Sequence, residues 1–119
     1  MNSPNSQRPA ALIGNHLMAD LYGVEPSLLT DESGLLNLLL DALRGAGFNV
    51  VKQLSHRFPG ENAGVTAIAL LSESHAAFHT YPEHGYIALD IFSCGCPDPD
   101  EVLAVIVETL SPCHIDTCL

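Results

Sequence analysis

The sequence predicts an α+β fold, a two-layer sandwich in which an antiparallel sheet carries two helices on one face, in the order β-α-β-β-β-β-α-β. Two separate segments have apolar residues at helical spacing. Between them lie short apolar segments separated by turn residues, which is typical of strands. Strands that follow one another through tight turns pair antiparallel, which leaves the helices on one face. A length of 119 residues fits a single domain, 1–119.

Periodicity and turn residues place the first elements. Residues 1–10 are polar and are expected to form a flexible lead-in, and the apolar stretch over 11–22 predicts the first strand. The clearest helix covers 31–46, where Thr30 or Asp31 can act as the N-cap. Leucines recur at helical spacing along it, at Leu35, Leu36, Leu39 and Leu43. Gly45 and Gly47 follow as signals for the end of the helix.

Short strands and a second helix should follow. The four strands are expected over residues 49–58, 64–71, 75–80 and 85–92. Acidic residues at 98, 100 and 101 favour a helix N-terminus, so a helix is predicted over 98–110. Its buried face should consist of Val102, Val105, Ile106 and Leu110. Pro112 ends this helix, and 113–119 can add a last strand.

Composition and charge argue against several classes of protein. With 14 acidic and 4 basic residues the formal net charge is −10, which disfavours nucleic acid as a partner because phosphates repel an acidic surface. No apolar segment approaches the roughly 20 residues that a membrane-spanning helix needs. The first ten residues lack the pattern of a secretory signal, so we expect a cytoplasmic protein. The cysteines are then expected to be reduced; they are Cys94, Cys96, Cys113 and Cys118.

Chemically distinctive residues concentrate between positions 70 and 95. They are Glu73, Ser74, His75, His79, Glu83, His84, Cys94 and Cys96. Taken singly they allow ordinary interpretations, with Ser74 as a turn serine and Cys94 as a small buried side chain. His75 and His79 can share one face of a helix or a strand and so offer two zinc ligands. Completing that site needs a cysteine from 94 or 96, and no CxxC pair supports it, so we expect no metal.

Taken together, these residues resemble a known family. The run over 70–95, LLSESHAAFHTYPEHGYIALDIFSCG, closely resembles the signature of bacterial S-adenosylmethionine decarboxylases, which are pyruvoyl enzymes made by self-cleavage of a proenzyme. The segments 14–17 (GNHL) and 56–58 (HRF) are also similar to the family's, so the resemblance covers about 11–110. It implies cleavage into a β chain, 1–73, and an α chain, 74–119, that begins with the pyruvoyl group.

The resemblance also implies a role for each residue of the site. Ser74 Oγ would attack the carbonyl of Glu73 and exchange the peptide bond for an ester. β-Elimination and hydrolysis then leave the pyruvoyl group, which forms a Schiff base with the substrate amine and acts as an electron sink. For processing, His79 matches the base, and Thr66 matches the hydroxyl for which the family usually has serine. For turnover, Cys94 matches the proton donor to Cα. For substrate binding, Glu83 matches the carboxylate that binds the ribose, and Phe58 matches the aromatic ring that stacks on adenine.

The implied reaction is decarboxylation of S-adenosylmethionine to decarboxylated S-adenosylmethionine, the aminopropyl donor for spermidine and polyamine synthesis. Relatives that decarboxylate ornithine or arginine share the same scaffold, so either amino acid is the alternative substrate. Two departures from the family pattern bear on this choice, the longer loop over 59–63 and the threonine at 66. Two different classes of function also fit these residues, a non-enzymatic, unprocessed relative and a metal-binding module.

A homodimer of αβ units is the expected assembly. A sheet with helices on one face leaves the other face uncovered, and a half-apolar face on so small a chain favours a twofold dimer. The family resemblance also implies active sites at a dimer interface. The other expected partner is the small-molecule substrate S-adenosylmethionine.

Overall fold

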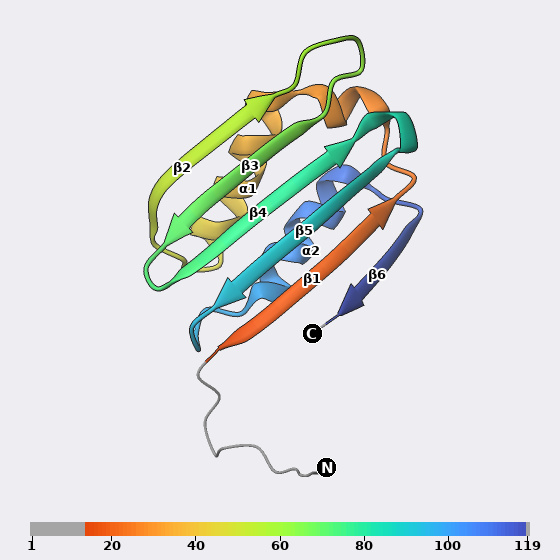
Figure 1. The fold of residues 1–119 in the computed structure, drawn as a ribbon. Helices are drawn as coiled ribbons and strands as arrows, with labels where there is room; N and C mark the ends of the chain where they lie inside the picture. Colours follow the sequence, from red (N-terminus) through yellow and green to blue (C-terminus); the bar gives the residue numbers. More distant parts are fainter. Residues whose placement is uncertain (1–13, 119) are drawn as a thin grey trace.

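A computed structural model describes residues 14–118 and shows a six-stranded antiparallel sheet with two helices (Figure 1). The elements are β1 (Asn15–Tyr22), η1 (Pro26–Thr30), α1 (Glu32–Gly45), β2 (Val50–Arg57), β3 (Val65–Leu71), β4 (Ser74–Tyr81), η2 (Pro82–His84), β5 (Tyr86–Ser93), α2 (Pro99–Leu110) and β6 (His114–Cys118). The predicted fold class and element order are confirmed. The expected lead-in over 1–10 lies outside the described residues.

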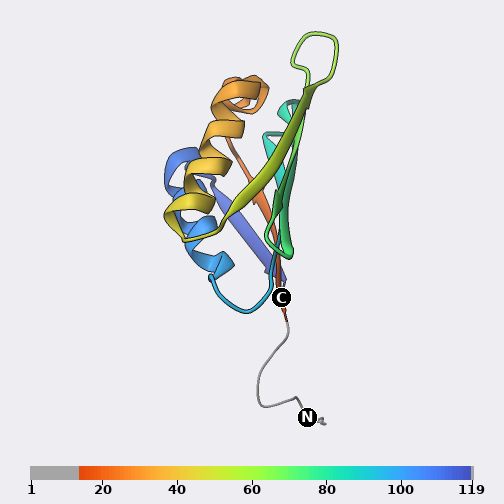
Figure 2. The ribbon, with the colours of Figure 1, turned by 90° about the vertical axis from the view of Figure 1, so that its left-hand side faces the viewer.

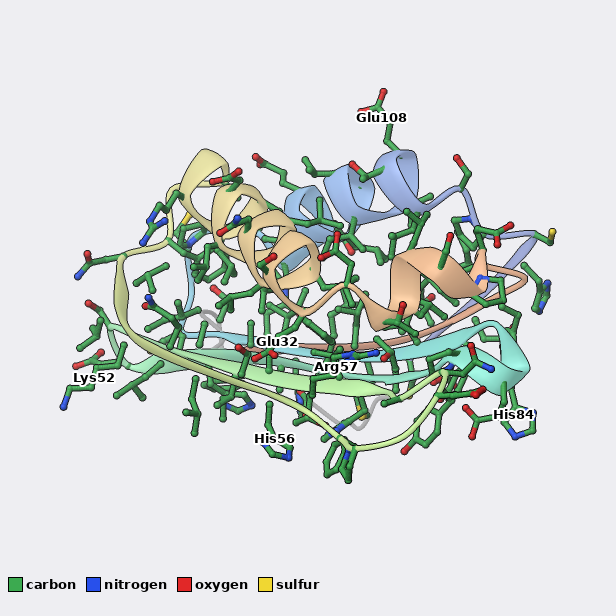
Figure 3. All side chains as sticks on the ribbon, turned by 90° about the horizontal axis from the view of Figure 1, so that it is seen from above. Glu32, Lys52, His56, Arg57, His84 and Glu108 are labelled. Carbon is green, nitrogen blue, oxygen red and sulfur yellow. The ribbon has the colours of Figure 1, made fainter. Side chains whose placement is uncertain are left out.

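Both helices cover the same face of the sheet, which gives the two-layer sandwich (Figure 2). The central strands alternate between buried and exposed residues, as a sheet with one buried face requires. The core between sheet and helices contains leucines of α1, Phe78 of β4, Ile91 of β5 and Ile106 of α2. The opposite face, from which His56 projects in Figure 3, is not covered by any described element and is called the open face below.

An aspartate caps the start of each helix, and for the first helix this confirms the expected N-cap Asp31. The side chain of Asp31 accepts a hydrogen bond from the backbone N–H of Gly34 at 3.1 Å, and Asp98 accepts one from Asp100 at 2.9 Å. One prediction for the second helix was wrong, because Val105 is 41% exposed. The buried line of α2 runs through Val102, Ile106 and Leu110. The side chains that flank it against the core belong to residues 103 and 107, which turns residue 105 toward solvent.

The strand order is β2-β3-β4-β5-β1-β6. β1 therefore lies between β5 and β6, with Asn15 opposite Ser93 and Tyr22 opposite His114. This insertion places the first strand of the chain beside the segment that carries the most distinctive residues. Among the described helices, neither is long and apolar enough to cross a membrane.

Candidate active site

The peptide bond expected to break lies in the turn between β3 and β4. Leu71 pairs with Ser74, so that only Ser72 and Glu73 form the turn. Glu73 has φ +59°, a left-handed conformation that costs a non-glycine residue roughly 1–2 kcal/mol. Two hydrogen bonds with Asn49 hold the turn, since Asn49 Nδ2 donates to Ser72 Oγ at 2.8 Å and Ser72 N–H donates to the Asn49 carbonyl at 3.2 Å. The fold thus maintains a strained residue immediately before Ser74.

Ser74 and Cys94 meet at this end of the sheet, where β4 begins and β5 has just ended. The backbone N–H of Cys94 donates to Ser74 Oγ at 2.9 Å, and both residues are half-buried. The Cys94 thiol lies 3.9 Å from Glu73 Oε1. We call Glu73, Ser74 and Cys94 the turn group. Ser74 and Glu73 also line an open pocket of about 600 Å³ together with His16, His75 and Phe92.

Four other predicted site residues gather farther along the sheet. Thr66 and His79 are direct cross-strand partners, with Thr66 Oγ1 2.9 Å from His79 Nδ1. They line a second pocket of about 600 Å³ with Phe58 and Glu83. We call Phe58, Thr66, His79 and Glu83 the strand-end group. The only charged residues that line this pocket among the described residues, apart from histidine, are Glu61 and Glu83, so the pocket is acidic.

The turn after β4 positions Glu83. The short helix η2 is capped by Gly85, which has φ +59° and whose carbonyl accepts a hydrogen bond from the Val24 N–H at 2.9 Å. A Cβ at Gly85 would also lie 3.0 Å from the Val24 carbonyl oxygen, so glycine fits both the conformation and the close approach. The other wall is the β2–β3 loop, which protrudes beyond the sheet in Figure 1 and is closed by a bond from Phe58 N–H to the Gly64 carbonyl.

Within one chain the two groups do not meet. His79 lies five residues beyond Ser74 on the same strand, and at about 3.3 Å per residue the two are roughly 16 Å apart. The structure therefore assembles Glu73, Ser74 and Cys94 at one end of β4. It assembles the strand-end group at the other end.

Sequence reasoning missed two groups on the open face. One is His16, His75 and Asp90, whose ligand atoms all lie within 4.8 Å of one another. The other is a row of rings across four strands, in which Tyr81, Tyr86 and Tyr22 stack in turn and Tyr22 meets His114. The alternation within each strand marks these residues as sharing a face. The order of the strands in the sheet depends on contacts between residues far apart in the sequence, and the alternation within a strand does not predict it.

The tyrosine row includes a perturbed phenol. Tyr86 donates a hydrogen bond to Asp20 Oδ1 across the β1–β5 pair. That bond, with a smaller contribution from burial, holds the pKa of the Tyr86 phenol well above its usual range, because ionisation would remove the donor and place two negative charges together. Tyr86 is therefore a fixed neutral hydrogen-bond donor on the open face.

The chain is similar in sequence to proteins named as decarboxylase proenzymes. The chain is 39% identical over 106 residues to an S-adenosylmethionine decarboxylase proenzyme of Pyrobaculum arsenaticum, covering 88% of this chain and 84% of the relative. It is also 39% identical over 102 residues to an arginine decarboxylase proenzyme of Ignicoccus hospitalis, covering 85% of this chain and 71% of the relative. A crystal structure of the adenosylmethionine decarboxylase from Aquifex aeolicus superimposes with a TM-score of 0.84 at 31% identity, covering 92% of this chain and 89% of the other.

The family model for S-adenosylmethionine decarboxylase matches residues 15–118, and the chain belongs to this family. Proenzyme decarboxylases of the family carry a pyruvoyl group derived from a serine. The names of the relatives divide between S-adenosylmethionine and arginine decarboxylase at equal identity, so membership fixes the reaction class and leaves the substrate open.

Proposed function

We propose that the chain is a self-processing decarboxylase of S-adenosylmethionine, cleaved between Glu73 and Ser74, whose product serves as the aminopropyl donor in spermidine and polyamine synthesis. The observation that carries the proposal is the strained turn: Glu73 at φ +59° directly before a serine whose Oγ is held by the Cys94 N–H. These residues fit a serine-derived pyruvoyl group, because the turn holds a half-buried serine directly after the strained Glu73 at the end of the sheet.

Self-cleavage follows from the chemistry of the turn. Ser74 Oγ accepts the hydrogen bond from Cys94, so its own O–H proton is free to leave as Oγ attacks the Glu73 carbonyl carbon. The C–N bond breaks as the C–O bond of an ester forms, and the Ser74 nitrogen takes up the proton. A base then removes the Cα proton of Ser74, the Cβ–O bond breaks, and Glu73 leaves as a carboxylate. Breaking the chain here also releases the backbone strain at Glu73.

During turnover, the pyruvoyl group supplies an electron sink for the electron pair left at Cα when carbon dioxide departs. The residues around it bind the substrate and handle its proton. The backbone of Cys94 contacts Ser74, and its thiol lies 3.9 Å from Glu73 Oε1. We assign to this thiol the delivery of a proton to Cα. The acidic pocket around Glu83 suits a cationic substrate, and the exposed Phe58 ring at its rim offers a face to a base or a sulfonium.

We propose further that a second copy completes the site. Thr66 and His79 lie about 16 Å from Ser74 in their own chain, which is too far for proton transfer. In a face-to-face dimer with its twofold axis perpendicular to the strands near Ala77, the strand-end group of each copy lies over the turn group of the other. The open face favours such a dimer, because it exposes Met18, Ile68 and Leu70, and small Ala77 and Ala88 lie between them.

Arginine is the second candidate substrate. A relative named arginine decarboxylase proenzyme is as similar as one named for S-adenosylmethionine. The acidic pocket suits a guanidinium as well as a sulfonium, and ornithine decarboxylation would use the same turn group.

The deciding experiment measures release of carbon dioxide from S-adenosylmethionine, arginine and ornithine by the purified protein. We expect the protein to run as two fragments, 1–73 and 74–119, and to decarboxylate S-adenosylmethionine with the highest kcat/KM. Ser74→Ala should remain one chain and be inactive. Turnover of arginine or ornithine with none of S-adenosylmethionine would replace the proposed substrate, and cleavage of Ser74→Ala would refute the processing mechanism.

A further inference from the structure

A group of three side chains on the open face has the composition of a metal site. His16 comes from β1, His75 from β4 and Asp90 from β5. His16 and His75 are each cross-strand partners of Phe92, one on either side of it, and Asp90 lies two residues before Phe92 on the same face. Its carboxylate therefore reaches back between the two imidazoles.

The donor atoms converge to ligand-like separations. His16 Nε2 contacts Asp90 Oδ1 directly, His75 Nε2 lies 3.7 Å from the same oxygen, and all three ligand atoms fall within 4.8 Å of one another. Ligands at about 2.0–2.2 Å from a tetrahedral ion lie about 3.4 Å apart. Small side-chain rotations close the difference. Two imidazoles with one carboxylate form a donor set that binds zinc and other divalent transition metals and leaves positions open for water.

Phe92 holds the two imidazoles in place. Its ring stacks on His75 at 5.9 Å with an interplanar angle of 22°, and it meets the edge of His16 at 5.9 Å and 84°. Within a single chain the cluster is about half exposed, with side-chain exposures of 42–44%, so the ligand atoms are not enclosed by their own chain. Binding would need little ordering of the side chains, because the sheet and Phe92 already orient them.

The carboxylate of Asp90 has only histidine partners among the described residues, which favours binding of a cation beside it. Every ion pair found among residues 14–118 joins a histidine to an aspartate, and Asp90 has no lysine or arginine partner there. The chain has a formal net charge of −10, which raises the local concentration of cations at its surface. A divalent ion held by the two imidazoles would also compensate the carboxylate charge of Asp90.

We propose that His16, His75 and Asp90 bind one divalent transition-metal ion of the zinc class. This set differs from the zinc ligands considered from the sequence. His79 is four residues from His75 on the same strand, about 13 Å away, and Cys94 and Cys96 are not part of the cluster. The site borders the pocket that contains Ser74, since His16 and His75 line that pocket too.

Metal binding is tested on untagged, chelator-treated protein by calorimetric titration with Zn²⁺ and by the visible absorption of added Co²⁺. We expect one ion per chain, and a visible Co²⁺ band of tetrahedral or five-coordinate intensity. Asp90→Asn and His16→Gln should each weaken binding at least tenfold. The matched control is His114→Gln. His114 Nε2 lies 3.0 Å from Asp116 Oδ1, but no third ligand joins this pair. This variant should bind as the wild type does.

The same titration of Ser74→Ala separates this proposal from the proposed function, because that variant tests the metal site without self-cleavage. Equal binding in Ser74→Ala and in the wild type is expected. Circular dichroism establishes that the variants remain folded, and the closely isosteric Asp90→Asn carries the conclusion if His16→Gln does not fold. Wild-type binding no tighter than that of Asp90→Asn, or equal losses in His114→Gln, would refute the metal site.

Discussion

Ser74 and His79 would act at different steps of the proposed processing, and the structure separates them in space. Ser74 Oγ is held at the turn by the Cys94 N–H, whereas His79 Nδ1 pairs with Thr66 Oγ1 farther along β4. A residue that serves only as the elimination base is needed after the ester has formed. Its loss should therefore leave the first step intact, which distinguishes it from loss of the nucleophile.

For His79→Ala we expect the chain to stall as the ester at residue 74. Hydroxylamine cleaves esters and should then split the stalled protein into fragments of the sizes expected for 1–73 and 74–119, as seen on a denaturing gel. Ser74→Ala is the control and should resist hydroxylamine, because no ester forms. Processing of His79→Ala at the wild-type rate without an added nucleophile would contradict the assigned role.

Glu83 should discriminate between substrates with and without a ribose. Glu83→Gln keeps an acceptor oxygen and loses the charge, so a charge-assisted bond to a hydroxyl becomes an ordinary one. We expect kcat/KM for S-adenosylmethionine to fall roughly tenfold to a hundredfold. His84→Gln, on the next residue, is the exposed control and should have little effect. An unchanged kcat/KM in Glu83→Gln would remove Glu83 from the binding site.

At the scale of elements, the β3–β4 hairpin is the part whose local conformation contradicts residue preference. Glutamate is an unusual residue at φ +59°, so the pairing of Leu71 with Ser74 and the bonds with Asn49 impose the conformation. A glycine at this position would adopt it without strain. The strain is thus a property of this sequence in this turn, and it can be removed by one substitution.

In a Ser74→Ala background, Glu73→Gly should stabilise the chain by a net of about 0.5–1 kcal/mol, after the greater backbone entropy of glycine is subtracted. Urea unfolding measures this difference. Glu73→Ala is the matched control, since it also loses the carboxylate but keeps the strain. With Ser74 present, Glu73→Gly should process about fivefold more slowly than Glu73→Ala. Equal rates for the two would show that the strain does not contribute to cleavage.

The elements themselves could be predicted because periodicity and caps are local signals. Asp31 and Asp98 cap the two helices, and the four strands between the helices begin and end within a residue of the expected positions. The insertion of β1 between β5 and β6 could not be predicted, because strand pairing depends on contacts between residues far apart in the chain. For the same reason the sequence placed all seven site residues in one group, and nothing in it joined His16 to Asp90.

At the scale of the whole molecule, the proposed dimer makes each site depend on both chains. A chain with Ser74→Ala retains the strand-end group, and a chain with His79→Ala retains the turn group. Neither homodimer holds a complete site. A mixed dimer holds one complete site, formed by Ser74 of one copy and His79 of the partner subunit.

Co-expression of Ser74→Ala and His79→Ala chains, each with a distinguishable mass, should therefore restore cleavage. We expect only the His79→Ala chain to be cut, because it alone retains Ser74, and mass spectrometry identifies the cut chain. Co-expression of His79→Ala with Thr66→Ala is the control and should give no cleaved His79→Ala chain, because neither chain supplies an intact Thr66–His79 pair. Absence of any cut chain in the first mixture would contradict the shared site.

The position of β1 in the sheet has a consequence for the cleaved protein. A break between Glu73 and Ser74 leaves β1, β2, β3 and α1 on one fragment and β4, β5, α2 and β6 on the other. Along the sheet order the fragments interleave, because β1 of the first lies between β5 and β6 of the second, and β3 lies beside β4. Separating them would require rupture of three antiparallel ladders and division of a shared core. The molecule would therefore behave as a split protein whose halves stay interlocked, so that the loss of one peptide bond changes its chemistry while its shape persists.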